Sequence, residues 1–149
     1  QQGLTLVEQV AFDVRTVQSY LMVAALSCDR HEDYNRFVTR HRTDLSSAWN
    51  TIEAWFRRTH GREAQRHMDE YITNLANLHA QDGIRRAGQF CTGVAALWQD
   101  ALTQSGPISI AALTGRYTLA SPLDEVLSAL AARQPAPRQG TPAARTAQR

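Results

Sequence analysis

The sequence contains no lysine, only two cysteines and no long hydrophobic run, and these absences narrow the class of protein. All 16 basic residues of the 149-residue chain are arginines, which we attribute to coding bias rather than to function. No stretch of about 18 uninterrupted apolar residues occurs, so the sequence predicts no membrane span. The length predicts one domain with a core of its own and excludes a multidomain enzyme with a separate cofactor domain.

Positive charge is concentrated at the C-terminus. Residues 133–149 contain four arginines and no acid, whereas residues 1–132 hold 12 arginines against 14 acidic residues. A dedicated nucleic-acid binder would carry a basic face on its folded part, so this class is not expected.

Residues 134–149 lack large apolar side chains and cannot form a core alone. We expect this arm to contact a larger protein, with arginine side chains pairing with carboxylates or carbonyls. The expected partner-binding residues are Arg133, Arg138, Arg145 and Arg149.

Apolar residues recur at spacings of three and four through most of the chain, which predicts helices. The first expected helix covers residues 4–28. Asp29 and Glu32 fit a capping box that would open a second helix, and Gly61 fits its C-terminal cap. A third helix is expected from about residue 62 through Ala101, with Ser105-Gly106-Pro107 ending it.

Glycines complicate this third helix. Gln81-Asp82-Gly83 is a point where it could be interrupted, because glycine weakens a helix interior. Gly88 and Gly93 could instead allow a neighbouring helix to approach closely.

The region after the third helix is expected to differ from the bundle. Residues 107–120 resemble an extended strap, and Ser121-Pro122 fits the start of a short final helix. The sequence therefore predicts an all-α fold: an up-down bundle of three long helices, a short C-terminal helix, an extended strap and an irregular arm. The expected divisions are 1–104 for the bundle, 105–133 for the strap and short helix, and 134–149 for the arm.

Cys28 and Cys91 are expected to lie at the same height in the bundle. If the second helix descends over about 29 residues, an equal climb along the third ends near residue 91, because both helices rise about 1.5 Å per residue. Both cysteines lie on core stripes, so a disulfide is predicted; two buried free cysteines are the alternative. A disulfide indicates an oxidising compartment.

The N-terminal Gln1-Gln2-Gly3 resembles the start left by signal-peptide removal, or a chain shortened in another way. We expect a periplasmic or secreted protein.

The acids and histidines of the sequence form no complete catalytic or metal-binding pattern. His67 stands four residues after Glu63 and three before Glu70, but a di-iron bundle needs a second such set, so we expect an exposed ion pair. Motifs for covalent haem attachment and for a serine nucleophile elbow are also missing. The sequence predicts no catalytic residue, metal or cofactor. His41 and His79 fall near apolar stripes, which favours hydrogen-bonded core histidines.

Surface aromatic and basic residues suggest contacts with other proteins. Trp49 and Trp55 do not share one narrow stripe, so one of them is expected to be exposed, which would favour a protein contact. Arginines also gather around the second turn of the bundle, where they form either a solvated mixed-charge end or a patch for an anionic partner. These are Arg57, Arg58, Arg62 and Arg66.

Several short runs resemble a set of small exported helical proteins of Gram-negative bacteria. The runs are Leu-Met-Val-Ala-Ala-Leu-Ser-Cys at 21–28, Tyr-Asn-Arg-Phe-Val-Thr-Arg at 34–40, Tyr-Ile-Thr-Asn-Leu-Ala-Asn at 71–77, and Phe90-Cys91. The resemblance covers about residues 10–102. It implies export and a bundle with paired cysteines, and it supplies no catalytic residues.

Three functions follow from these observations. The first is a non-catalytic periplasmic accessory subunit that docks on and stabilises a larger complex. In size and class the chain is similar to the small third subunit of membrane-bound quinoprotein alcohol dehydrogenases, which would make such a dehydrogenase the complex. The second is a free-standing periplasmic module that binds a small apolar ligand, with Gly83, Gly88 and Gly93 making room beside the third helix. The third is a hydrolase or metal enzyme around His67.

Overall fold

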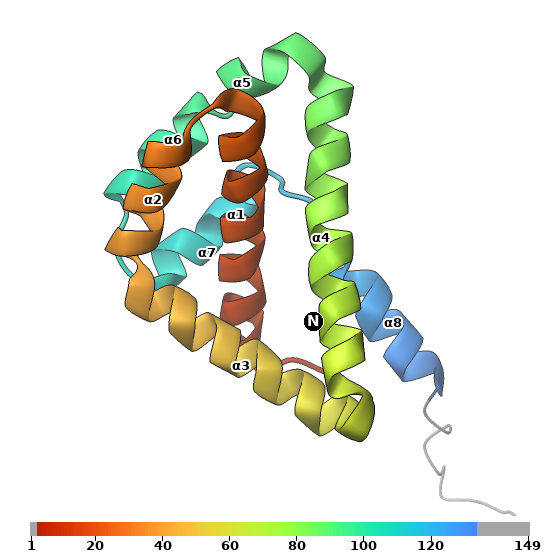
Figure 1. The fold of residues 1–149 in the computed structure, drawn as a ribbon. Helices are drawn as coiled ribbons and strands as arrows, with labels where there is room; N and C mark the ends of the chain where they lie inside the picture. Colours follow the sequence, from red (N-terminus) through yellow and green to blue (C-terminus); the bar gives the residue numbers. More distant parts are fainter. Residues whose placement is uncertain (1–2, 134–149) are drawn as a thin grey trace, which may run out of the picture.

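The computed structural model describes residues 3–133, and all regular secondary structure in this range is helical (Figure 1). This confirms the all-α class. The main helices are α1 (Leu6–Cys28), α2 (His31–Arg40), α3 (Arg42–His60), α4 (Ala64–Arg86), α6 (Ala95–Thr103), α7 (Pro107–Arg116) and α8 (Leu123–Arg133). Short elements join them: η1 (Gly61–Glu63), η2 (Ala87–Gln89) and α5 (Phe90–Gly93).

Helix α1 is the centre of the arrangement. It contacts α2, α3, α4, α5 and α7. In Figure 1, α4 runs alongside α1, α3 crosses below both, and α2 and α6 lie side by side at the upper left. Helix α7 lies behind α1, and α8 lies outside α4. The helices therefore surround α1, and the up-down bundle of three long helices that the sequence predicted is not confirmed.

The capping box of this fold is at the start of α1, not at residue 29. The Thr5 side chain accepts from the Glu8 amide at 3.1 Å, and the Glu8 carboxylate accepts from the Thr5 amide at 2.9 Å. Asp29 instead ends α1 in the left-handed conformation, with φ 56° and ψ 50°. This conformation is unlike the extended backbone of an N-cap, so Arg30 precedes α2 without a side-chain cap.

The second and third predicted helices are each divided into shorter helices, whereas the first is continuous. The second divides at His41, where the backbone turns to φ −109° and ψ 21°. The third continues through Gly83 and breaks at Ala87, which has φ 50°. The predicted interruption at residues 81–83 is therefore wrong. Asp82 is held within the helix by a 2.7 Å hydrogen bond from Tyr20 of α1.

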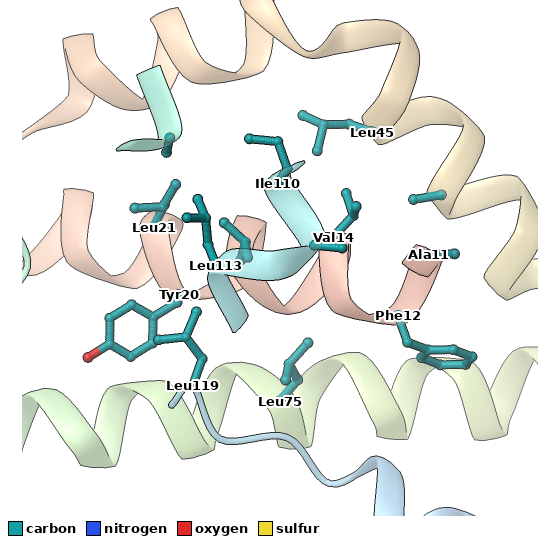
Figure 2. Close-up of a cluster of buried hydrophobic side chains, with 14 of the residues drawn as sticks. Ala11, Phe12, Val14, Tyr20, Leu21, Leu45, Leu75, Ile110, Leu113 and Leu119 are labelled. Carbon is teal, nitrogen blue, oxygen red and sulfur yellow. The ribbon is translucent and has the colours of Figure 1, made fainter. Parts of the chain in front are cut away.

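The predicted strap is mostly helix α7. Gly106, with φ 89°, precedes Pro107 at the first helical position, where a missing amide hydrogen costs no hydrogen bond. Ile110 and Leu113 of α7 are fully buried, and Figure 2 shows them among side chains of α1. The expected start of α8 is confirmed, because Ser121 Oγ accepts from the Leu123 amide at 3.1 Å.

Aromatic side chains dominate the core where α1, α3 and α4 meet. The ring of Phe12 makes edge contacts with Trp55 at 5.5 Å and with Tyr71 at 5.3 Å between centroids. Such pairs stabilise beyond their apolar burial. This cluster fixes the lower end of α1 between α3 and α4.

Candidate protein-binding surface

An open apolar groove lies between α1, α3 and the first turn of α7. Its volume is about 330 Å³. Leu6, Val7 and Val10 form the α1 wall, and Pro107 and Ile108 form the α7 wall. The third wall, on α3, consists mainly of small side chains. We call this feature the α1/α3/α7 groove.

The groove concentrates exposed apolar surface. The large hydrophobic side chains of Leu6, Val7 and Ile108 are 78, 68 and 72% exposed. Within residues 3–133 there are six such exposed large hydrophobics, and these three gather at one place. Contiguous apolar surface of this kind marks contact sites more often than single exposed residues do.

Asp44 is the one charged residue among those described that line the groove. It lies in the first turn of α3, where a carboxylate is favoured by the helix dipole. The side chain is half-buried and has no hydrogen-bond or ion-pair partner within residues 3–133. The groove thus combines apolar walls with one available carboxylate.

The α1 end of the groove is held in place by a charged link to α3. Glu8 pairs with Arg58, and this contact joins the first turn of α1 to the last turn of α3. Burial raises the pKa of Glu8, but hydrogen bonds from Thr5 and Arg58 outweigh it and hold that pKa below its ordinary value. Glu8 is therefore a structural anion rather than a free group of the surface.

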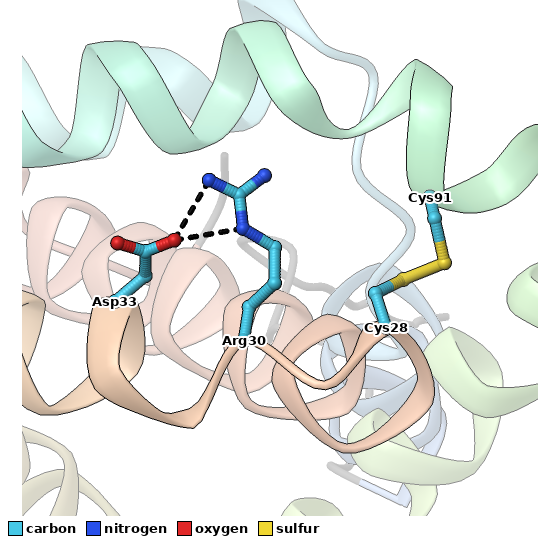
Figure 3. Close-up of a disulfide and its surroundings, with 4 residues drawn as sticks. All are labelled: Cys28, Arg30, Asp33 and Cys91. Atoms are coloured by element: carbon cyan, nitrogen blue, oxygen red, sulfur yellow. Dashed lines mark hydrogen bonds and ion pairs between the residues drawn. A yellow bond between two sulfur atoms is a disulfide. The ribbon is translucent and has the colours of Figure 1, made fainter.

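The two cysteines meet at the opposite end of α1 (Figure 3). Cys28 and Cys91 lie at disulfide distance, with Cα atoms 5.6 Å apart, as the sequence predicted. Arg30 lies over the ring of Trp98 in α6 at 5.3 Å and donates to Asp33 at 2.7 Å. The bond and the arginine together attach α5 and α6 to the end of α1.

His41 and His79 are hydrogen-bonded core residues, as predicted. His41 is 3% exposed, and its Nε2 lies 2.8 Å from the Ala101 carbonyl. His79 is fully buried between Ser19 Oγ at 3.1 Å and the Ala120 carbonyl at 2.8 Å. Ser19 is also buried, at 1% exposed, so the Ser19–His79 contact joins α1 to α4 inside the core.

Trp49 is the exposed member of the tryptophan pair, also as predicted. It is 37% exposed, whereas Trp55 is 1% exposed. The guanidinium of Arg15 lies 5.2 Å from the Trp49 ring centroid, so an arginine of this chain already covers part of it. Trp49 is not among the residues that line the groove.

The acids and His67 near the α3–α4 corner form local charged contacts. Arg66 pairs with Glu63 at 2.9 Å and with Glu70 at 3.3 Å. In the described part of the chain, no three histidine, cysteine or acidic side chains are grouped as a metal site would require.

Two further sets of predicted residues have different outcomes. Gly83 packs against the ring of Phe90, with 3.4 Å from an ideal Cβ position to the nearest ring atom. Gly88 and Gly93 have nothing within 4 Å of theirs, so the expected close approach of a neighbouring helix is wrong. Arg133 ends α8, and the other expected arm residues lie outside the described range: Arg138, Arg145 and Arg149.

Sequence reasoning missed the groove itself. The apolar spacing of the first helix includes Val7 but not Leu6, and Ile108 falls in the segment that the sequence predicts as a strap. The available signal was two adjacent apolar residues, Leu6 and Val7, of which a single helix stripe cannot bury both.

Within residues 3–133 no helix is both long enough and apolar enough to cross a membrane. Comparison with protein-family models, with curated proteins and with solved structures finds no match to the chain.

Proposed function

We propose that this protein is a non-catalytic accessory subunit of the periplasm that docks on a larger protein through the α1/α3/α7 groove. The supporting observation is the gathering of Leu6, Val7 and Ile108 around an apolar groove at one end of α1. The cysteine pair at disulfide distance is compatible with an oxidising compartment.

The chemistry of the groove specifies the partner. Apolar walls favour apolar side chains, and the unpaired Asp44 carboxylate favours an arginine or lysine beside them. The occupant is therefore a segment of the larger protein with two or more apolar side chains next to a basic residue. A membrane-bound dehydrogenase is the complex suggested by the similarity in size and class.

A small apolar ligand is the second candidate, because about 330 Å³ is near the lower end of ligand-site volumes. The exposure of the walls favours a protein instead. Ligand pockets bury roughly 70–90% of the ligand surface, whereas Leu6, Val7 and Ile108 each remain more than two-thirds exposed. At the alternative site, Phe90 fills the space beside Gly83, and Gly93 lines a cleft of only about 60 Å³, far below ligand-site volumes.

Site-specific photocrosslinking tests the proposal. A photoreactive amino acid would replace Val7 or Ile108 in cells of the source organism, with Ile84 as the matched control because it is 79% exposed and outside the groove. We expect one larger protein to crosslink from positions 7 and 108 but not from 84. The crosslinked peptide should contain apolar residues beside an arginine or lysine, and Asp44→Asn should reduce its yield.

The other outcomes contradict the proposal in different ways. A crosslink to a second copy of this chain would assign the groove to self-association, and a crosslink to a small molecule would favour the ligand-binding module. Equal yields from positions 7 and 84 would show that the groove has no special role.

The C-terminal arm is a separate part of the proposal. Deletion of residues 134–149 removes three arginines and no acid. We expect this deletion to weaken co-purification with the partner found by crosslinking. The arm contributes nothing to docking if the deleted and complete chains co-purify equally at physiological salt.

A further inference from the structure

A second open groove lies between α2 and α6, the two helices at the upper left of Figure 1. Its volume is about 400 Å³. Asn35, Arg36, Thr39 and Arg40 form the α2 wall, and Leu102 forms the α6 side. Leu102 is half-buried and packs against the core, so the groove has an apolar floor. We call this feature the α2/α6 groove.

The charge of the α2/α6 groove is positive. No acidic residue is among the described residues that line it. Arg36 shares one carboxylate with Arg30, because Asp33 lies 3.1 Å from Arg36 and 2.7 Å from Arg30. The Arg36 side chain is also 68% exposed. One acid therefore serves two guanidinium groups, and the exposed one faces the solvent of the groove.

Arg40 forms the edge of the groove and ties α2 to the end of α6. Its Nε donates to the Gln104 carbonyl and its Nη2 to the Thr103 carbonyl, both at 3.0 Å. The same Nη2 donates to Ser105 Oγ at 3.0 Å. All three acceptors are uncharged, and within residues 3–133 Nη1 has no acceptor. The tie therefore fixes the position of a guanidinium that can still bind a carboxylate.

This tie separates the α2/α6 groove from the α1/α3/α7 groove. Arg40 lines the former, and Asp44, four residues later, lines the latter. Their Cα atoms are therefore at most about 14 Å apart. On the other side of the tie, Ser105 is followed two residues later by Pro107, which lines the α1/α3/α7 groove. The two grooves are neighbours of opposite charge, close enough for one segment to reach both.

We propose that the docked segment of the partner continues from the α1/α3/α7 groove over the Arg40 tie into the α2/α6 groove, where it places an acidic residue. This inference rests on the proposed docking and specifies the segment that docks. Apolar side chains occupy the first groove with an arginine or lysine beside Asp44, and an aspartate or glutamate binds Arg36 and Arg40. The order of charges along the surface then allows only one orientation of the segment.

Photocrosslinking from the second groove tests the inference. A photoreactive amino acid would replace Thr39, which is exposed in the α2/α6 groove. His31 is the control position, because it is exposed at the start of α2 and does not line the groove. We expect position 39, but not position 31, to capture the same protein as position 7. The peptides captured from positions 7 and 39 should overlap or adjoin in the partner, and the second should contain an acidic residue.

Charge variants then test the role of Arg36. The captured segment would be synthesised as a fluorescent peptide, and its binding to the full chain measured by anisotropy. At low salt Arg36→Glu should weaken binding about fivefold and Arg36→Gln about twofold. Both effects should disappear near 1 M salt, where charges are screened beyond about 3 Å.

Arg57→Glu is the matched control. Arg57 is an exposed arginine of α3 outside both grooves, and this variant changes the net charge of the protein equally. A peptide whose acidic residue is replaced by arginine should recover binding with Arg36→Glu but not with Arg57→Glu. Circular dichroism checks the fold of each variant, and Arg36→Gln replaces Arg36→Glu if the latter does not fold.

The outcomes separate this inference from the proposed function. Capture of no larger protein at position 7 overturns docking at the α1/α3/α7 groove, and this inference with it. Capture at position 7 but not at position 39 overturns only the inference. A peptide without an acidic residue at position 39 also overturns it, as does equal peptide binding by the Arg36 and Arg57 variants.

Discussion

Removal of the Cys28–Cys91 bond should destabilise the protein mainly through the unfolded chain. The two residues are 63 apart in sequence, and closing a loop of that length restricts the unfolded chain by about 4 kcal/mol on the entropy model. Cys91 is exposed and Cys28 is half-buried, so replacing them by alanine removes little packing. We therefore expect the double variant Cys28→Ala/Cys91→Ala to lose about 4 kcal/mol of unfolding free energy. Its midpoint temperature should fall by about 15 °C.

Urea unfolding followed by circular dichroism measures this loss. The comparison includes the oxidised protein, the same protein with a reducing agent, and the double variant with and without that agent. The reduced protein and the double variant should be equally stable, and the variant should not respond to reduction. A loss below about 1 kcal/mol would refute the loop-closure reasoning. Two titratable thiols in the denatured, unreduced protein would show that the bond is absent.

Other predictions concern the core, one strained residue and pH. Phe12→Ala should cost about 3–5 kcal/mol, because it opens a cavity in the aromatic cluster, whereas Ile84→Ala at an exposed site should cost less than about 0.5 kcal/mol in the same urea assay. Ala87→Gly should stabilise the protein by up to about 1 kcal/mol, because glycine adopts a positive φ without a Cβ clash; a loss of stability would contradict this. Burial lowers the pKa of His79 despite hydrogen bonding to Ala120. The folded state therefore binds fewer protons there than the unfolded state, and stability should fall as the pH drops below about 6.5. His79→Gln should flatten that part of the stability profile measured by urea unfolding.

Local patterns in the sequence predicted features that depend on neighbouring residues along one helix. The apolar spacing of residues 4–28 predicted α1. A similar spacing in the predicted third helix identified His79 as a core residue. The cysteine pairing required one further step, a comparison of helix lengths. It succeeded although α2 and α3 are separated at His41, because α4 still brings the chain back to the upper end of α1.

Features that depend on contacts between distant segments were not predictable in this way. The alternation Ile108-Ser109-Ile110 suggested an extended segment, yet burial of Ile110 and Leu113 against α1 gives this region a helical spacing. Helix α4 ends at Ala87, which takes a positive φ, whereas the next residue, Gly88, does not. The residue type at the break therefore did not predict it. The groove likewise exists only because α7 packs near the start of α1.

The Cys28–Cys91 bond also gives the covalent chain a ring with two branches. The ring contains α2, α3 and α4, whereas most of α1 forms one branch and α6, α7 and α8 form the other. Of the groove walls, the one on α3 belongs to the ring, and those on α1 and α7 belong to separate branches. A single protease cut between residues 28 and 91 would therefore leave all three walls on one covalently connected molecule. After denaturation, such a cut would yield two separate fragments only if the bond is also reduced, whereas a cut in either branch would yield two fragments without reduction.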